Sequence, residues 1–187
     1  MSDLASSYDS VRNLETVLAN QRYLHWVNVE LSSYQWWLLT ALSIVSLLVW
    51  LKFVDRTRLI ELLLYGSIIA ILSVTLDEFG YEYRLWSYNV HLLSQLPHIS
   101  WIYYFIMPII YMLIYQFYND WRSFSIAMII YAAIGAFVME PLLVFMDAYV
   151  QLKWRYIYSF PIYLAMGIAA KGLVKKLLKI SNSVVQK

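Results

Sequence analysis

Five long apolar stretches, separated by short polar or charged segments, constrain the fold of this chain most strongly. They span about residues 34–54, 59–76, 101–118, 124–146 and 156–174. A helix of roughly 20 apolar residues crosses the hydrocarbon core of a bilayer. Charged residues make up only 14% of the chain, against about 25% in soluble domains. The sequence therefore predicts an all-α membrane protein with about five transmembrane helices, and residues 34–174 form the bundle.

The segments outside these stretches differ in character. In residues 1–33, apolar side chains recur at three- and four-residue spacings, which favours an amphipathic helix on the membrane or the bundle over a partly ordered tail. Residues 81–100 mix Trp and Leu with polar side chains and are expected to be an interfacial or a re-entrant segment. Residues 175–187 are a basic tail. No cleavable signal peptide is expected, because the first apolar stretch is too long and begins too late.

Composition narrows the partners and the chemistry. Eight Trp and seventeen Tyr, many at the ends of the apolar stretches, are typical of the aromatic belts at membrane interfaces. The chain has no cysteine, which excludes disulfides and thiolate chemistry. Its basic residues are scattered, so no nucleic-acid partner is predicted. The expected partner is the lipid bilayer.

The Lys and Arg distribution predicts an orientation. With five crossings, the N-terminus shares one side with residues 77–100 and 147–155, and that side carries five Lys and Arg residues. The opposite side carries nine. Cytoplasmic loops hold the excess of positive charge in membrane proteins. We therefore expect the N-terminus outside and the C-terminus in the cytoplasm.

Glu140 is the most unusual residue within these stretches. It lies inside residues 124–146 and is followed at once by Pro141. A carboxylate at that depth costs at least about 2.5–3.5 kcal/mol unless it is paired or faces water. Pro108 and Pro161 fall at a similar depth in two other stretches, and each proline removes a backbone hydrogen bond. The sequence predicts a polar pocket around Glu140 that opens to the outside.

Small and hydroxyl-bearing side chains at helical spacing indicate which faces meet inside the bundle. Such stripes recur in four of the five stretches, and they favour close helix packing. They would also line a polar cavity. The residues expected at the ligand site are Glu140, Asp77, Tyr104, Tyr111, Ser159, Tyr163 and Arg155. The competing interpretation is that the stripes serve packing alone and that the charges at the mouth pair with one another.

Recognisable catalytic and cofactor motifs are absent from the sequence. His91 and His98 lack a convincing third ligand for a metal, and the chain has no glycine-rich phosphate loop or nucleotide motif. No metal or cofactor is predicted. Asp77 or Glu78 together with Glu140 could perform acid–base chemistry if their environments separated their pKa values.

Several short strings occur in a particular order from Tyr34 onward. They are Lys52-Phe-Val-Asp55-Arg56-Thr-Arg58 with Glu61, Asp77-Glu78-Phe79-Gly80, Leu85-Trp86-Ser87-Tyr88, Pro108-Ile-Ile-Tyr111-Met-Leu-Ile-Tyr115-Gln116, Glu140-Pro141, and Lys153-Trp154-Arg155-Tyr156-Ile-Tyr158-Ser159-Phe160-Pro161-Ile-Tyr163. In this order the chain resembles an uncharacterised family of small multi-pass membrane proteins (conserved hypothetical proteins) of spore-forming Gram-positive bacteria. The resemblance implies a bacterial plasma-membrane protein and carries no activity, substrate or cofactor.

Three functions remain open from the sequence. The first is binding, transport or sensing of a small ligand or ion through the pocket around Glu140, and five spans would favour a homo-oligomer. The second is a membrane enzyme that acts on a lipid or isoprenoid with carboxylates at the pocket floor. The third is a structural or accessory membrane subunit whose polar stripes serve assembly. We expect the first.

Overall fold

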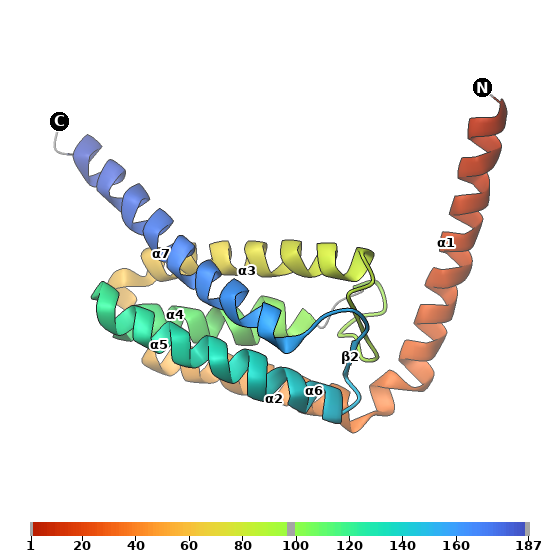
Figure 1. Ribbon diagram of the computed structural model, residues 1–187, viewed down its shortest axis with the longest axis horizontal. Helices are drawn as coiled ribbons and strands as arrows, with labels where there is room; N and C mark the ends of the chain where they lie inside the picture. The colour runs from red at the N-terminus through yellow and green to blue at the C-terminus, as the bar shows by residue number, and fades with distance from the viewer. Residues whose placement is uncertain (1, 97–99, 186–187) are drawn as a thin grey trace.

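The computed structural model describes residues 2–96 and 100–185, and most of them are helical (Figure 1). The all-α expectation is confirmed. A long first helix is followed by a bundle of antiparallel helices. In chain order the helices are α1 (Ser2–Asn28), α2 (Tyr34–Phe53), α3 (Leu59–Glu82), α4 (Met107–Phe117), α5 (Trp121–Ile134), α6 (Glu140–Phe145) and α7 (Tyr156–Val185).

Within the described residues, four helical stretches are long and apolar enough to cross a membrane. They are Tyr34–Phe53, Arg56–Glu82, Trp121–Phe145 and Tyr156–Ser181. The third stretch expected from the sequence is instead a shorter apolar helix, Ile102–Phe117. Figure 1 shows that it runs through the bundle, and it packs mainly against α3. The membrane character and the multi-pass architecture follow from these lengths and compositions.

The remaining boundaries differ from the sequence expectations at two helix ends. The second stretch was expected to end at residue 76, but α3 continues to Glu82, so Asp77 lies inside the helix. The last was expected to end at residue 174, but α7 continues to Val185. The basic residues after 174 therefore extend this helix over the described range.

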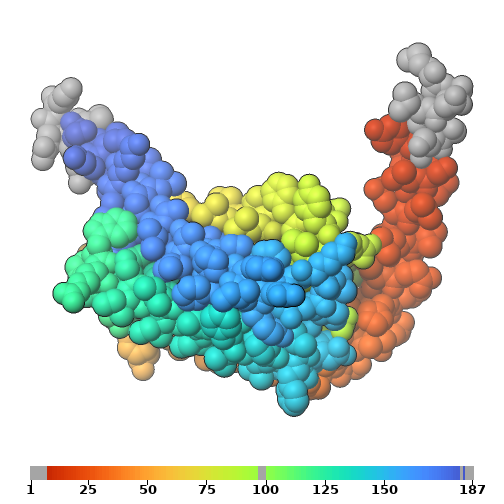
Figure 2. Space-filling model, viewed as in Figure 1, coloured from red at the N-terminus to blue at the C-terminus, as the bar shows by residue number. Residues whose placement is uncertain are grey.

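α1 forms a helix that projects from one end of the bundle (Figures 1 and 2). Its apolar side chains, including Leu14, Val17, Leu18 and Leu24, are exposed. α1 meets the cap through polar contacts instead: Arg22 donates to the Tyr81 hydroxyl at 3.1 Å, and the Trp26 indole donates to the carbonyl of His91 at 3.1 Å.

The core of the bundle lies between α3, α4, α5 and α7. Leu62, Tyr65, Tyr111, Phe124 and Met128 are fully enclosed there. Small residues allow the close approach that membrane helices need. A Cβ atom on Gly66 would lie 2.5 Å from the Met112 sulfur, and one on Gly167 would lie 2.6 Å from the Met128 methyl carbon. Gly66 and Gly167 therefore lie at close contacts between helices.

Two of the prolines follow π-helical turns. The turn η3 (Ile102–Ile106) precedes Pro108, and the turn η4 (Gly135–Met139) precedes Pro141. The amide of Glu140 donates to the carbonyl of Gly135, five residues earlier. Proline lacks an amide donor and clashes with the preceding turn of an α-helix, and a wider turn relieves that clash. π-turns of this kind occur often at functional sites.

A two-stranded antiparallel sheet covers one end of the bundle. β1 (Trp86–Tyr88) pairs with β2 (Tyr149–Gln151), with Ser87 opposite Val150. Residues 81–100 were expected to be interfacial or re-entrant. In the described part, residues 83–96 contain this strand and irregular backbone, without a re-entrant helix. We call this end of the bundle, which also holds the start of α2, the cap end.

Both strands begin just after a helix that ends in the same way. Arg84 and Asp147 take left-handed backbone conformations, with φ of 54° and 56°. After α3, the amide of Leu85 donates to Gly80 and that of Arg84 to Tyr81. After α6, the amides of Ala148 and Asp147 make the equivalent bonds. This is the Schellman pattern, and it turns each chain from its helix into the sheet.

Candidate functional site

Asp77 is the centre of a polar cluster at the cap end. Its side chain is buried on α3, with 2% of the residue exposed. Its carboxylate accepts hydrogen bonds from the Trp86 indole (2.9 Å) and from the Tyr88 hydroxyl. The Tyr88 hydroxyl also lies 2.8 Å from that of Tyr103. Asp77 thereby fastens strand β1 to the last turns of α3.

Glu140 lies at the start of α6, directly after the turn η4. It is 7% exposed, and its Oε1 accepts a 2.6 Å hydrogen bond from the Tyr163 hydroxyl on α7. Its Oε2 is buried without a hydrogen-bond partner among the described residues. The Ser159 hydroxyl lies within range of a longer hydrogen bond to this carboxyl, and it accepts from the Trp154 indole at 2.8 Å. Oε2 therefore has no hydrogen bond of normal geometry among the described residues, and Ser159 is a polar neighbour of the carboxyl.

Gly135 explains how Tyr163 reaches Glu140. A Cβ atom at position 135 would lie 3.3 Å from the Tyr163 ring. The absence of a side chain at Gly135 lets the ring lie against the η4 backbone. The hydroxyl can then meet the carboxyl of Glu140 at the end of the turn.

The Asp77 and Glu140 groups adjoin one another through tyrosines. Tyr149 on β2 interacts electrostatically with both carboxyls, and Tyr103 interacts with Asp77 and with Tyr163. Burial raises the pKa of Tyr149, and the two carboxyls raise it further. Burial and then Asp77 likewise raise the pKa of Tyr88. The phenols of Tyr88 and Tyr149 therefore stay protonated at neutral pH, and the Tyr88 hydroxyl remains a donor to Asp77.

Tyrosines continue from Glu140 towards the opposite end of the bundle. The hydroxyl of Tyr111 on α4 donates to the backbone carbonyl of Tyr163 at 2.7 Å, and its ring meets that of Tyr131 edge-on, with centroids 4.8 Å apart. The Tyr65 hydroxyl donates to the carbonyl of Gly167 at 3.2 Å. Polar atoms thus recur along the interior of the bundle.

A second polar group closes the opposite end, which we call the basic end. Tyr65 stacks on Tyr115 with ring centroids 4.3 Å apart, and the Tyr115 hydroxyl donates to Glu61 at 2.5 Å. Arg58 donates to both carboxylate oxygens of Glu61, at 3.1 and 3.0 Å. Each charge here has a partner, so this group is a structural clasp between α3 and α4.

Lys171 is a fully buried cation at the basic end. Its Nζ donates to the carbonyl of Tyr118 at 2.9 Å and lies 3.9 Å from the centroid of the Phe124 ring. Cations stabilise the carbonyl end of a helix, and α4 ends just before Tyr118. Lys171 therefore ties α7 to the connection between α4 and α5.

The structure joins some of the expected site residues and separates others. Glu140, Tyr163, Ser159 and Tyr111 gather around one interior position, and Asp77 lies in the adjoining cluster. Tyr104 is 46% exposed on the bundle surface. Arg155 is exposed in the connection before α7. Neither of these two joins the group, and Glu78 is exposed beside the buried Asp77.

Sequence reasoning missed the aromatic residues that gather around Asp77. They are Trp86, Tyr88, Tyr103 and Tyr149. Alternation of Trp86 and Tyr88 around Ser87 is the period of a strand, and this signal was available. Nothing in the sequence indicated that this strand pairs with residues 149–151.

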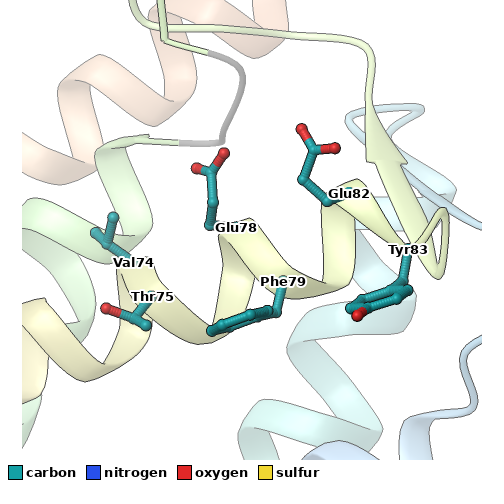
Figure 3. A pocket seen from close by; sticks show the side chains of 6 residues that line it. All are labelled: Val74, Thr75, Glu78, Phe79, Glu82 and Tyr83. Atoms are coloured by element: carbon teal, nitrogen blue, oxygen red, sulfur yellow. The ribbon is translucent and has the colours of Figure 1, made fainter.

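In the described part of the chain, hollows lie along α3 and beside α1 at the cap end, and Glu140 lines neither of these. One, of about 680 Å³, lies along the exposed side of α3 between Val74 and Tyr83. Figure 3 shows Glu78 and Glu82 pointing to one side of this helix, while Phe79 and Tyr83 point to the other. The other, of about 240 Å³, lies between α1 and residues 91–94.

No group of three His, Asp or Glu side chains in the described part of the chain is arranged to hold a metal ion. His91 contacts Glu30, with its Nδ1 3.1 Å from Oε1. His98, the other histidine considered from the sequence, lies outside the described residues.

Comparisons with protein-family models, with curated protein sequences and with solved structures find no match to this chain. The function of the candidate site can therefore be inferred only from its own residues and their contacts.

Proposed function

We propose that this protein binds a proton or a small cation at Glu140 and uses that binding for transport or sensing. The observation that carries the proposal is the buried Oε2 of Glu140, which has no hydrogen-bond partner among the described residues. An ionisable group inside a membrane bundle that is expensive to bury is by default a functional candidate. A proton on Oε2 would remove the buried charge while Oε1 keeps its bond to Tyr163.

The local backbone supports a small ligand. Pro141 has no amide N–H, so the helix lacks one donor beside the carboxyl. Carbonyl oxygens released at such breaks serve as ligands where they line a cavity inside a membrane protein. The tight packing of Tyr163 on Gly135 leaves little room for a larger molecule. A proton, or a cation the size of Na⁺, suits these surroundings better than an organic substrate.

The sheet supports five crossings rather than four. β1 and β2 pair, so they lie on the same side of any membrane that the bundle crosses. The chain between them passes through Ile102–Phe117 and then Trp121–Phe145. An even number of crossings must separate two segments on one side, so the short helix also crosses if the long one does. Its central residues, such as Pro108 and Tyr111, are buried by other helices. Because these residues contact protein instead of lipid, the helix can cross with a shorter apolar surface than a lipid-exposed helix needs.

With five crossings, the two termini lie on opposite sides of the membrane, and we propose the orientation expected from the Lys and Arg distribution. The cap end and the N-terminus would face the outside of a bacterial plasma membrane, and the basic end would face the cytoplasm. We also propose that the chain belongs to the family of membrane proteins from spore-forming Gram-positive bacteria that it resembles. The small size of the bundle would favour a homo-oligomer if the protein is a transporter.

The test is ion-coupled flux in liposomes that contain the purified protein. In vesicles with the wild-type protein, we expect a proton or Na⁺ gradient to drive uptake of that ion, read from quenching of an ion-sensitive dye. Glu140→Gln should reduce the rate of ion uptake to that of empty vesicles. Glu82→Gln is the matched control, because Glu82 is an exposed carboxylate at the same end of the bundle. Equal rates for the Glu140 and Glu82 variants, in folded protein, would contradict the proposal.

One observation favours a structural role as the second candidate. Asp77 binds the side chains of strand β1 and thereby builds the cap, so buried carboxyls in this bundle can serve assembly alone. If Glu140→Leu raised the melting temperature and left flux unchanged, the structural reading would replace the binding one.

A further inference from the structure

The hollow between α1 and residues 91–94 brings together polar groups that the proposed function does not use. It has a volume of about 240 Å³ and is lined by Leu18, Gln21, Arg22, His25, Glu30, His91 and Ser94. α1 leaves the bundle at the cap end (Figure 1), and the hollow lies between that part of the helix and residues 91–94. This level, beside the ends of the membrane-crossing helices, is where lipid headgroups lie.

Arg22 supplies the cationic side of this hollow. One of its guanidinium nitrogens donates to the hydroxyl of Tyr81 at 3.1 Å, which holds the side chain across the gap between α1 and α3. A guanidinium carries five N–H donors, so most of them remain for a ligand. Its planar fork suits the oxygens of a phosphate, and the amide of Gln21 lies one position away on α1.

Glu30 supplies the anionic side. The residue is 4% exposed. The amide of His91 donates to its Oε2 at 2.6 Å, and its Oε1 lies 3.1 Å from Nδ1 of the same histidine. His25 stands on the other side, with Nε2 3.7 Å from Oε1. The carboxylate is therefore fixed in position and still lines the hollow.

The hollow presents one permanent cation and one carboxylate. Arg22 contributes one positive charge and Glu30 one negative charge, at separate positions on the wall. A purely anionic group would meet the carboxylate, and a purely cationic group would meet the guanidinium. A ligand with a phosphate at one point and an ammonium at another matches both.

Apolar surface continues from the hollow along α1. Leu18 lines it, and Leu14, Val17 and Leu24 are exposed on the same helix. Exposed apolar side chains on a helix that lies at a membrane interface are covered by acyl chains. The ligand class that satisfies the hollow and this surface together is a phospholipid.

We propose that this hollow binds the headgroup of a zwitterionic phospholipid with a primary amine, its phosphate accepting from Arg22 and its ammonium donating to Glu30. The site would hold α1 at the membrane surface and is independent of Glu140. It places the N-terminal helix against lipid beside the polar contacts that join Arg22 and Trp26 to the cap.

Native mass spectrometry of the detergent-purified protein tests the site. Phosphatidylethanolamine, phosphatidylcholine and phosphatidylglycerol are added in equal amounts. We expect the wild type to retain phosphatidylethanolamine preferentially. Loss of a charge-assisted hydrogen bond weakens binding by about ten-fold, so Arg22→Gln should reduce this retention by about that factor. Arg22→Lys, which keeps the charge without the fork, should lie between the two.

Two further variants define the controls. Arg12→Gln changes the same residue type on the same helix, but Arg12 pairs with Asp9 at 3.3 Å and is largely exposed, so retention should stay at the wild-type level. Glu30→Gln can still accept from the His91 amide, and it should abolish the preference for phosphatidylethanolamine over phosphatidylcholine. All variants are compared by melting temperature to confirm that they fold.

The outcomes separate the alternatives. Equal retention by the Arg22→Gln and Arg12→Gln proteins would overturn the site. Equal retention of all three lipids by the wild type would overturn the pairing of the ammonium with Glu30. If free glycerophosphoethanolamine displaced the lipid at the same concentration, the headgroup alone would be the ligand and the assignment to a membrane lipid would fail.

Discussion

At the scale of single residues, the hydrogen bond from Tyr163 stabilises the buried carboxyl of Glu140. The Tyr163 hydroxyl is the donor to Oε1, and the other oxygen has no partner in the described residues. Tyr163→Phe would remove the hydrogen bond to Oε1 and leave only Ser159 beside the buried carboxyl. We expect a loss of about 1.5–3 kcal/mol in the free energy of unfolding, the usual contribution of a hydrogen bond to a charged group, measured by thermal unfolding in detergent.

Tyr104→Phe is the matched control for that prediction. Tyr104 is 46% exposed, and its hydroxyl makes no hydrogen bond in the described part of the structure, so removing it should leave the melting temperature unchanged. A similar loss of stability in both variants would show that the phenol–carboxyl bond is not the cause.

Tyr104 and Tyr103 also show what a sequence can predict about a site. Helical spacing put Tyr104 on the same face as Pro108 and Tyr111. The π-turn η3 adds one residue to the turn before Pro108, so the residue five positions before the proline, Tyr103, faces inward. Glu140 and Tyr163 were predictable because one is costly in a membrane and the other lies on a regular helix. A register shift caused by a π-turn leaves no comparable signal.

At the scale of elements, one substitution after the C-terminal end of α3 should raise the stability of the fold. Arg84 occupies the left-handed position of the Schellman turn, where side chains other than glycine are strained. Arg84 is exposed. Arg84→Gly should therefore raise the free energy of unfolding by up to about 1 kcal/mol, measured by denaturant or thermal unfolding. An exposed substitution outside such a turn, Glu82→Gly in the last turn of the helix, should lower it.

The start of α5 gives a pH-dependent prediction. Asp120 caps this helix by accepting from the Ser123 amide at 2.8 Å, and hydrogen bonds from Ser123 hold the pKa of Asp120 below its ordinary value of 3.8. The cap stabilises the fold fully above pH 3.8, and its contribution is lost as the pH falls through the lowered pKa. Asp120→Asn keeps a capping oxygen and should remove this part of the acid dependence, read as melting temperature between pH 6 and pH 3.

The cap is the element that sequence patterns described least well. Trp86 and Tyr88 alternate around Ser87 as in a strand, but three residues are too few to predict pairing. Their partner lies more than sixty positions away, at residues 149–151. Long-range pairing depends on both Schellman turns and on the buried Asp77, and none of these is a local property. The helices, by contrast, were predictable from local composition. Their observed ends differ from the expected ones where polar residues such as Asp77 continue a helix.

At the scale of the whole molecule, the strand pair and the short helix Ile102–Phe117 make one joint prediction about topology. The helix has about 24 Å of length at 1.5 Å per residue, less than a bilayer core of roughly 30 Å. The pairing of β1 with β2 nevertheless requires it to cross if Trp121–Phe145 crosses. Shielding by neighbouring helices supplies the physical reason, since Tyr111 and Met112 touch protein instead of lipid.

Because the chain contains no cysteine, single cysteines can map this topology directly. Arg84→Cys and Lys153→Cys sit in exposed positions at the cap end, and Asn119→Cys and Lys176→Cys sit in exposed positions at the basic end. A membrane-impermeant thiol reagent applied to intact cells should label the first two, and the other two should require permeabilised cells. Labelling of Arg84→Cys and Asn119→Cys from the same side would mean that the short helix does not cross. If Lys153→Cys were then labelled from the other side, the pairing of β1 with β2 would be ruled out as well.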